Sequence, residues 1–244
     1  MKKFYDFIPV TSALGFNSYY ICANTPDGAE ILRYNKNTGA LQQFNQYEKA
    51  ILFDGEITNS GFAIAGTIEG VGQGNQMFLQ SYDSLLKLKW TYLYNYTNGN
   101  YNDTASQMKV SGNNIYIAGT SSGAVGDFGM LLKINETGNL LWARRLISGA
   151  NLNTLKSLAV DAGADQAYVL TEQQRVIKYN SNGVQAFNRL IPLPVPSLGG
   201  NYNYITTDGR PGQMASKVIL GGTNSYKKYY HPPIRIGTTF GIRV

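Results

Sequence analysis

Charged residues, cysteine and histidine are all scarce in this chain of 244 residues. Asp, Glu, Lys and Arg make up 15% of the sequence, with one Cys and one His in total. A soluble domain ordinarily carries about 25% charged residues. The low value excludes a coiled coil, a helical bundle rich in Glu and Lys, and a charged disordered tail. With one His and fifteen carboxylates, the chain has few side chains that could act as catalytic groups or metal ligands. We therefore predict no enzyme activity, no metal and no cofactor.

Other absences narrow the setting. Cys22 lies in an apolar run and has no second cysteine to pair with, which predicts a buried structural thiol. No apolar run approaches the ~20 residues needed to span a bilayer. The first residues imitate a signal peptide, but Asp6 and Pro9 interrupt the apolar stretch that should follow, so no signal peptide is expected. The net charge is +6, yet its Lys and Arg are scattered, which favours a solvated surface and no nucleic-acid partner.

The sequence contains an internal repeat. A short β-rich run ending in small residues occurs at 20–25, 62–67, 115–120, 167–171 and 218–223, in steps of 42, 53, 52 and 51 residues. A second run follows each copy and ends in a residue that favours turns: Asn35, Asp83, Asn135, Asn180 and Gly237. Glycines then stand where a hairpin needs positive φ: Gly39, Gly138, Gly183 and Gly241. Seven residues after each turn-start residue stand apolar or aromatic residues, Trp90, Trp142, Phe187 and Val244, except in the first copy, where Gln42 interrupts the pattern.

The middle position of the second run is mostly basic. It is occupied by Arg33, Ser81, Lys133, Lys178 and Arg235. We interpret it as an outward-facing strand position with a solvated charge. The alternative is a ring of ligand contacts.

Each repeat unit predicts four strands in meander order. In the third unit these are residues 106–110, 114–120, 129–135 and 139–146, and no stretch shows sustained helical periodicity. Units of 40–50 residues with four strands are typical of a β-propeller. We therefore predict one all-β domain, residues 1–244, forming a five-bladed β-propeller of four-stranded antiparallel blades at about 1–48, 49–99, 100–149, 150–196 and 197–244. The alternative is five blades of a larger ring completed by another chain.

The third unit resembles two known kinds of propeller repeat. Residues 115–120 and 131–142 are similar to the bacterial β-propeller repeats called SBBP. The turn from Asn135 to Trp142 is also similar to the quinoprotein-like repeat, whose outer turn reads Asp-x-x-Thr-Gly-x-x-x-Trp, although it is one residue shorter. The resemblance implies a propeller used for binding and carries over no catalytic or cofactor residue. Five-bladed lectins of the tachylectin-2 type are similar in size, but their sequence signature is absent.

The carboxylates fit turns better than catalysis. A glycosidase would need a pair of them facing the central channel, and the candidates are Asp54, Glu56, Asp103, Asp161, Asp165 and Asp208. The Asp-Gly pairs at 54–55 and 208–209, and the run 161–163, are interpreted as turns between first and second strands.

Three segments rich in Tyr and Asn are the candidate binding residues. They contain Tyr94, Tyr96, Tyr101, Asn102, Tyr202, Tyr204, Tyr226, Tyr229 and Tyr230. Tyr gives a rigid amphipathic face and Asn adaptable hydrogen bonds, as in antibody paratopes. Protein partners are the prediction for these residues, glycans are the alternative, and ordinary loop packing is the third interpretation.

The sequence thus predicts a non-enzymatic binding or assembly module that engages other protein subunits. The predicted setting is a released particle such as a phage virion, or the extracellular cell surface. The alternatives are a carbohydrate-binding lectin and, less favoured, a glycosidase.

Overall fold

The computed structural model describes residues 8–15, 17–70, 74–96, 101–123, 126–148, 151–152, 154–191, 201–207, 218–224, 227–230 and 234–235. These residues form antiparallel sheets, with no α-helix among them. Blade 1 consists of β1 (Ile8–Leu14), β2 (Ser18–Thr25), β3 (Gly28–Asn35) and β4 (Leu41–Glu48). Blade 2 consists of β5 (Ala50–Thr58), β6 (Gly61–Glu69), β7 (Asn75–Tyr82) and β8 (Leu88–Tyr94).

The later blades repeat this plan. Blade 3 consists of β9 (Asn102–Ser111), β10 (Asn114–Gly123), β11 (Gly126–Asn135) and β12 (Leu140–Arg145). A short hairpin of β13 (Ile147–Ser148) and β14 (Asn151–Leu152) leads to blade 4, which consists of β15 (Leu155–Asp161), β16 (Gln166–Thr171), β17 (Arg175–Tyr179) and β18 (Gln185–Leu190). Blade 5 consists of β19 (Asn201–Thr207), β20 (Val218–Asn224), β21 (Lys227–Tyr230) and β22 (Ile234–Arg235).

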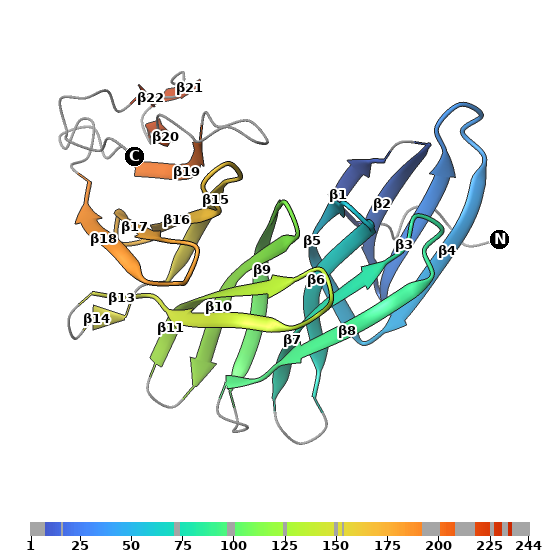
Figure 1. Cartoon of the computed structure of the whole chain (residues 1–244), viewed down its shortest axis with the longest axis horizontal. Helices are drawn as coiled ribbons and strands as arrows, with labels where there is room; N and C mark the ends of the chain where they lie inside the picture. The colour runs from blue at the N-terminus through green and yellow to red at the C-terminus, as the bar shows by residue number, and fades with distance from the viewer. Residues whose placement is uncertain are drawn as a thin grey trace.

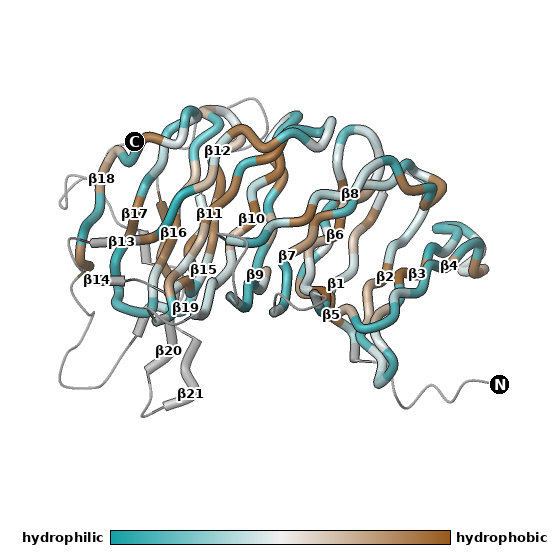
Figure 2. The backbone as a smooth tube through the Cα atoms, turned by 90° about the horizontal axis from the view of Figure 1, so that it is seen from below, coloured by the Kyte–Doolittle hydropathy of each residue, from teal (hydrophilic) through white to brown (hydrophobic). Residues whose placement is uncertain are grey.

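The predicted all-β architecture of five four-stranded antiparallel units is confirmed. In blades 1 to 4 the strands pair in meander order. Blade 5 differs because β21 and β22 both pair with β20. Together they occupy the position that a single strand, the third of the blade, occupies in blades 1 to 4. Gly237 and Gly241, the last turn positions of the repeat, lie outside the described residues. Figure 2 shows the apolar stretches concentrated in the middle strands of blades 3 and 4, with hydrophilic turns at their ends.

The core lies between successive blades rather than within any one of them. Four clusters of buried side chains join blade 1 to 2, 2 to 3, 3 to 4 and 4 to 5. In the first cluster the rings of Tyr20 and Phe62 are stacked with centroids 4.7 Å apart. Cys22 is completely buried there, and burial, aided by the charge of Asp54, raises the pKa of its thiol to about 12. The prediction of a buried structural thiol is therefore confirmed.

A repeated hydrogen bond also joins the first strands of neighbouring blades. At three interfaces a backbone N–H of the next blade donates to a side-chain oxygen of the preceding blade: Met108 to Asp54 (2.9 Å), Leu158 to Gln107 (2.6 Å) and Ile205 to Ser157 (3.2 Å). Each accepting residue directly follows a register shift in its strand. A bulge of this kind re-aims a side chain out of the regular pleat, and here it places the acceptor against the next blade.

Asp54 corrects one prediction. It lies inside β5 instead of in a turn, although the Asp-Gly pair is a strong turn signal. Gly55 is needed for packing, because a Cβ there would meet the Phe62 ring at 2.8 Å and the Cys22 sulfur at 3.3 Å. At Asp161 the turn interpretation is confirmed, since its carboxylate accepts hydrogen bonds from the backbone of Gly163 and Ala164. Asp208 lies outside the described residues.

The five blades follow one another along an arc. The first strands pack in chain order, β1 on β5, β5 on β9, β9 on β15 and β15 on β19. Figure 1 shows blades 1 and 5 apart at the two ends of this arc. Among the described residues β19 does not pack on β1 as the other first strands pack on their neighbours. The ring closure expected from dividing the chain into five units is thus absent between the described strands.

Candidate protein-binding site

Four of the nine predicted binding residues gather where blade 2 meets blade 3. Tyr94 ends β8 and Tyr96 follows it, while Tyr101 directly precedes β9 and Asn102 begins that strand. The sequence brings them together because the chain passes here from the outermost strand of one blade to the first strand of the next. We call Tyr96, Tyr101, Phe128 and Arg145 the tyrosine cluster.

Aromatic edges and one guanidinium hold the tyrosine cluster together. The ring of Tyr96 meets Tyr101 edge-on at 5.4 Å and Phe128 at 5.0 Å. Arg145 lies over both Phe128, at 4.3 Å, and Tyr96, at 5.5 Å, and it donates a hydrogen bond of 3.2 Å to the Tyr96 hydroxyl. Phe128 is fully buried, whereas both tyrosines are half-buried and Arg145 is exposed. The cluster therefore presents an ordered aromatic and cationic surface to solvent.

A buried carboxylate anchors the cluster from below. Asp103 is completely buried and accepts a hydrogen bond of 2.7 Å from the backbone N–H of Tyr96. Burial raises the pKa of the Asp103 carboxyl, and the hydrogen bond from the Tyr96 backbone opposes the shift. Asp103 thus fixes the backbone at Tyr96 and is not accessible as a catalytic acid.

An aromatic stripe along β8 adjoins the tyrosine cluster. Trp90, Tyr92 and Tyr94 alternate along the strand, and each packs partly buried against the core between blades 2 and 3. Burial, aided by the negative charge of Asp103, raises the pKa of Tyr94. Tyr94 therefore fits both the loop-packing and the partner-binding interpretation, because its ring packs against blade 3 while part of the side chain stays exposed.

Asn102 lies beside the tyrosine cluster, and the remaining predicted residues lie elsewhere. Asn102 is exposed, and its side-chain oxygen accepts a hydrogen bond of 3.0 Å from the backbone of Asn75. Tyr202 is only 5% exposed and belongs to the core between blades 4 and 5, which leaves no surface for a partner. Tyr204 is 43% exposed on β19. Tyr226 lies outside the described residues, and for Tyr229 and Tyr230 only the backbone, in β21, is described.

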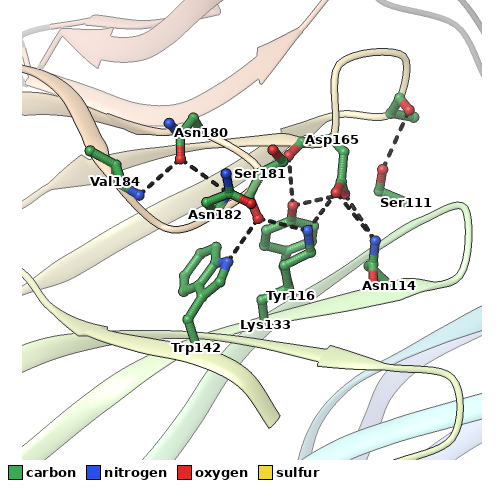
Figure 3. A network of polar contacts seen from close by, with 11 residues as sticks. Ser111, Asn114, Tyr116, Lys133, Trp142, Asp165, Asn180, Ser181, Asn182 and Val184 are labelled. Carbon is green, nitrogen blue, oxygen red and sulfur yellow. Dashed lines mark hydrogen bonds and ion pairs between the residues drawn. The ribbon is translucent and has the colours of Figure 1, made fainter. Parts of the chain in front are cut away.

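Figure 3 shows a polar network between blades 3 and 4 that the sequence analysis missed. The Lys133 ammonium forms an ion pair with Asp165 and donates a hydrogen bond of 3.0 Å to the carbonyl of Ser181. The Tyr116 hydroxyl donates to the same carboxylate at 2.9 Å, and the Asn114 amide donates to it at 3.2 Å. Burial and the neighbouring Asp165 raise the pKa of Tyr116.

The network corrects the interpretation of the mostly basic middle position of the second run, which Lys133 and Lys178 occupy in blades 3 and 4. Lys133 is 3% exposed, so the expected solvated charge is wrong at this position. The strand register places Lys133 opposite Tyr116 on the interblade face, and its ammonium lies 5.4 Å from that ring. The equivalent Lys178 lies 5.2 Å from the Tyr168 ring, and burial lowers its pKa against the opposing effect of Asp161. Lys133 therefore joins blade 3 to blade 4 and does not form part of a ring of ligand contacts, whereas the contacts of Lys178 with Tyr168 and Asp161 lie within blade 4.

Tryptophans join the outer turns to the preceding blade in the same way. Trp90 Nε1 donates to the Glu136 carbonyl at 2.8 Å, and Trp142 Nε1 donates to the Ser181 carbonyl at 3.0 Å. Gly183 has a φ of +73° and lies so close to the Trp142 ring that a Cβ would approach it to 2.7 Å. The tryptophan of one repeat unit therefore packs against the turn glycine of the next unit, across the contact between two blades.

Within the described part of the chain, no three His, Cys, Asp or Glu residues come together as metal ligands. The candidate pair Asp54 and Glu56 is engaged elsewhere, Asp54 with the Met108 backbone and Glu56 in an ion pair with Lys109. The described residues also contain no helix with the length and hydrophobicity of a membrane span.

The fold has clear counterparts among solved structures, although no protein family and no curated protein sequence matches the chain. It is similar to BBS1N, solved in complex with ARL6DN, at 11% identity and a TM-score of 0.55, over 88% of this chain and 61% of that one. Sqt1 of Saccharomyces cerevisiae is similar at 9% identity and a TM-score of 0.57, over 89% and 58% of the two chains. The WD40 β-propeller domain of Doa1 is similar at 12% identity and a TM-score of 0.52, over 87% and 60%.

These likenesses define the class of fold. The chain is a β-propeller in architecture, with blades of four antiparallel strands. It spans about 60% of the length of the solved structures that it resembles. At these identities the likeness concerns the fold alone.

Proposed function

We propose that this protein is a non-enzymatic binding and assembly module that engages another protein through its tyrosine cluster. The observation that carries the proposal is the packing of Tyr96, Tyr101 and Arg145 into one partly exposed surface. Tyr and Arg are enriched among the residues that dominate the energy of protein interfaces.

The internal packing of the cluster favours tight binding. Ordering a long side chain at an interface costs about 0.5–1.5 kcal/mol in lost rotamer freedom. Arg145 is already held over two rings and bonded to Tyr96 before any partner arrives. A partner that adds a carboxylate to Arg145 and an apolar side chain to the tyrosines would meet a surface that is ordered in advance.

The fold supports a protein partner. BBS1N, which has the same architecture, was solved in complex with the protein ARL6DN. The setting that we propose is a multi-subunit particle such as a phage virion, because a sequence poor in charge and rich in Gly and Tyr resembles that of exposed, assembled β proteins.

Gradient fractionation of the native source tests this proposal. The wild-type chain should sediment with intact particles, and Arg145→Glu should release it because the cation over the rings becomes a repelled anion. Arg189→Glu is the matched control, since Arg189 also lies on an outermost strand over an aromatic ring, Phe187, at 5.7 Å. Recovery of the wild-type chain only as a soluble monomer would contradict the proposal.

A glycan array separates the lectin alternative. The protein proposal expects no sugar to be retained. Retention of a sugar by the wild type, lost in Arg145→Glu and kept in Arg189→Glu, would assign the same surface to carbohydrate instead.

A further inference from the structure

Blade 1 has an apolar face on which no other described blade packs. One row of side chains crosses its four strands, from Leu14 through Tyr19 and Tyr34 to Leu41, as the strand pairing shows. Among the described strands that pack against blade 1, all belong to blade 2, on the opposite side.

A second row runs beside the first on the same face. It crosses the blade from Ser12 through Ile21 and Leu32 to Phe44. Tyr19 is 42% exposed and Phe44 is 59% exposed, although both are aromatic. We call the side chains of Leu14, Tyr19, Ile21, Leu32, Tyr34, Leu41 and Phe44 the open face of blade 1.

The open face occupies the positions that the other blades bury between them. In strand register, Tyr19 corresponds to Phe62, Ile115 and Ala167, all fully buried at interblade contacts. Ile21 corresponds in the same way to Ile64, Ile117 and Val169, which are also buried. Successive side chains of β2 point to opposite faces of blade 1, and both faces carry apolar residues suited to packing between blades. A described blade packs on only one of these faces.

We propose that the open face of blade 1 packs against a propeller blade supplied by a different polypeptide chain. This surface is distinct from the tyrosine cluster, so the proposal goes beyond the proposed function. Exposed apolar patches of this kind mark interaction surfaces in soluble proteins, and the interblade register specifies the shape of the partner. The partner is an antiparallel sheet that turns an apolar face towards Tyr19 and Ile21, as blade 1 does towards Phe62 and Ile64.

Blade 5 and a second copy of the chain fit less well. Blade 5 lies at the other end of the arc, and β19 does not pack on β1. A second copy would add five blades to these five, whereas propellers contain about four to eight. The solved structures of the same architecture are longer than the matched region by about two-fifths of their length. Two or three further blades would therefore complete a ring.

Photo-crosslinking from position 19 tests the proposal in the native source. Replacement of Tyr19 by p-benzoylphenylalanine keeps an aromatic side chain on the open face and reports its neighbour by mass spectrometry. The expected product joins position 19 to a strand of another polypeptide whose sequence predicts four-stranded antiparallel units. Crosslinks to residues 201–235 of the same chain, crosslinks between two copies, or no crosslink at all would each overturn the proposal.

Reconstitution with the identified chain completes the test. The two purified chains should form a complex in which Tyr19→Arg raises the Kd by about 30-fold or more, as expected for a central interface aromatic. Leu190→Arg is the matched control, because Leu190 is 63% exposed on an outermost strand outside the open face, and it should change the Kd by less than about 3-fold. Equal effects of the two variants would overturn the proposal. Circular dichroism and Tm of both variants should equal those of the wild type, which excludes unfolding as the cause of any change in Kd. Equal Kd values for Tyr19→Arg and the wild type, with loss of the complex only in Arg145→Glu, would place the contact at the tyrosine cluster and overturn the proposal.

Discussion

Blade 1 presents two faces built from the same strands. The side of Tyr20, Cys22 and Ile31 packs against blade 2, and all three residues are buried. The side of Tyr19, Ile21 and Leu32 alternates with it, residue by residue, and is half-buried or exposed. Both faces are apolar, so composition does not separate them. The difference is that blade 2 packs on one face, whereas no blade among the described residues packs on the other. The same kind of apolar strand face is thus buried or exposed according to whether a blade lies beside it.

The largest expected loss of stability comes from a substitution in the packed face of blade 1 against blade 2. Phe62→Ala removes the ring that stacks on Tyr20 and leaves a cavity between blades 1 and 2. Truncation of a buried Phe costs about 3–5 kcal/mol, and we expect a loss of this size in the free energy of unfolding. Urea denaturation measures it, and a loss below about 1 kcal/mol would contradict the packing described here.

A smaller loss should follow from cutting the network between blades 3 and 4. Lys133→Met leaves the Asp165 carboxylate without its cation. Breaking a fully buried ion pair by removing one partner costs about 3–5 kcal/mol, and we expect a loss below this range because the Asp165 side chain is 29% exposed. The double variant with Asp165→Asn should cost less than the sum of the two single variants. Additive losses would show that the two groups do not interact.

The packed face of blade 1 should also respond to alkali. Burial raises the pKa of Tyr47 from 10.0 to about 12. The unfolded chain then releases this proton at a lower pH than the folded chain, so the folded chain binds more protons in that window and stability falls as the pH rises. The contribution is complete below pH 10.0 and is lost towards pH 12. Urea unfolding across this window should show the decline, and Tyr47→Phe should reduce its slope. An identical slope in the variant would remove Tyr47 from the explanation.

The smallest expected effect lies on the open face. Tyr19→Ala should change the free energy of unfolding of the purified chain by no more than about 0.5 kcal/mol, since surface substitutions away from packed features stay in this range. The contrast with Phe62→Ala, at the equivalent register position of blade 2, then measures what a neighbouring blade contributes. A loss of several kcal/mol in Tyr19→Ala would show that the face is already packed within the isolated chain.

Much of the fold was predictable because strand and turn signals are local. The four strands of the third unit, the turns at Asn135 and Asn180 and the buried Cys22 all follow from residues close in sequence. The first copy of the repeat was misaligned by one residue. Tyr20 pairs with Arg33 as Tyr116 pairs with Lys133, so Tyr20 corresponds to Ala63 and the first step is 43 residues, 63 minus 20.

The remaining features depend on contacts between distant residues. Lys133 meets Asp165 and Tyr202 enters the core of blades 4 and 5 only because blades stack side by side. No local pattern separates a strand residue facing solvent from one facing the next blade, which explains why the mostly basic middle position of the second run was misinterpreted and why Tyr202 was included among the surface residues. Ring closure likewise depends on the angle between blades, which blade counting does not supply.

Thiol labelling at position 19 tests the central claim most directly. In Tyr19→Cys the natural Cys22 stays silent, because it is fully buried and burial raises the pKa of its thiol to about 12. We predict rapid maleimide labelling of position 19 in the purified chain and strong protection of it in the native assembly, whereas Leu190→Cys should label in both. Protection of position 19 in the purified monomer, or equal labelling in both states, would contradict the claim that another chain supplies the missing neighbour of blade 1.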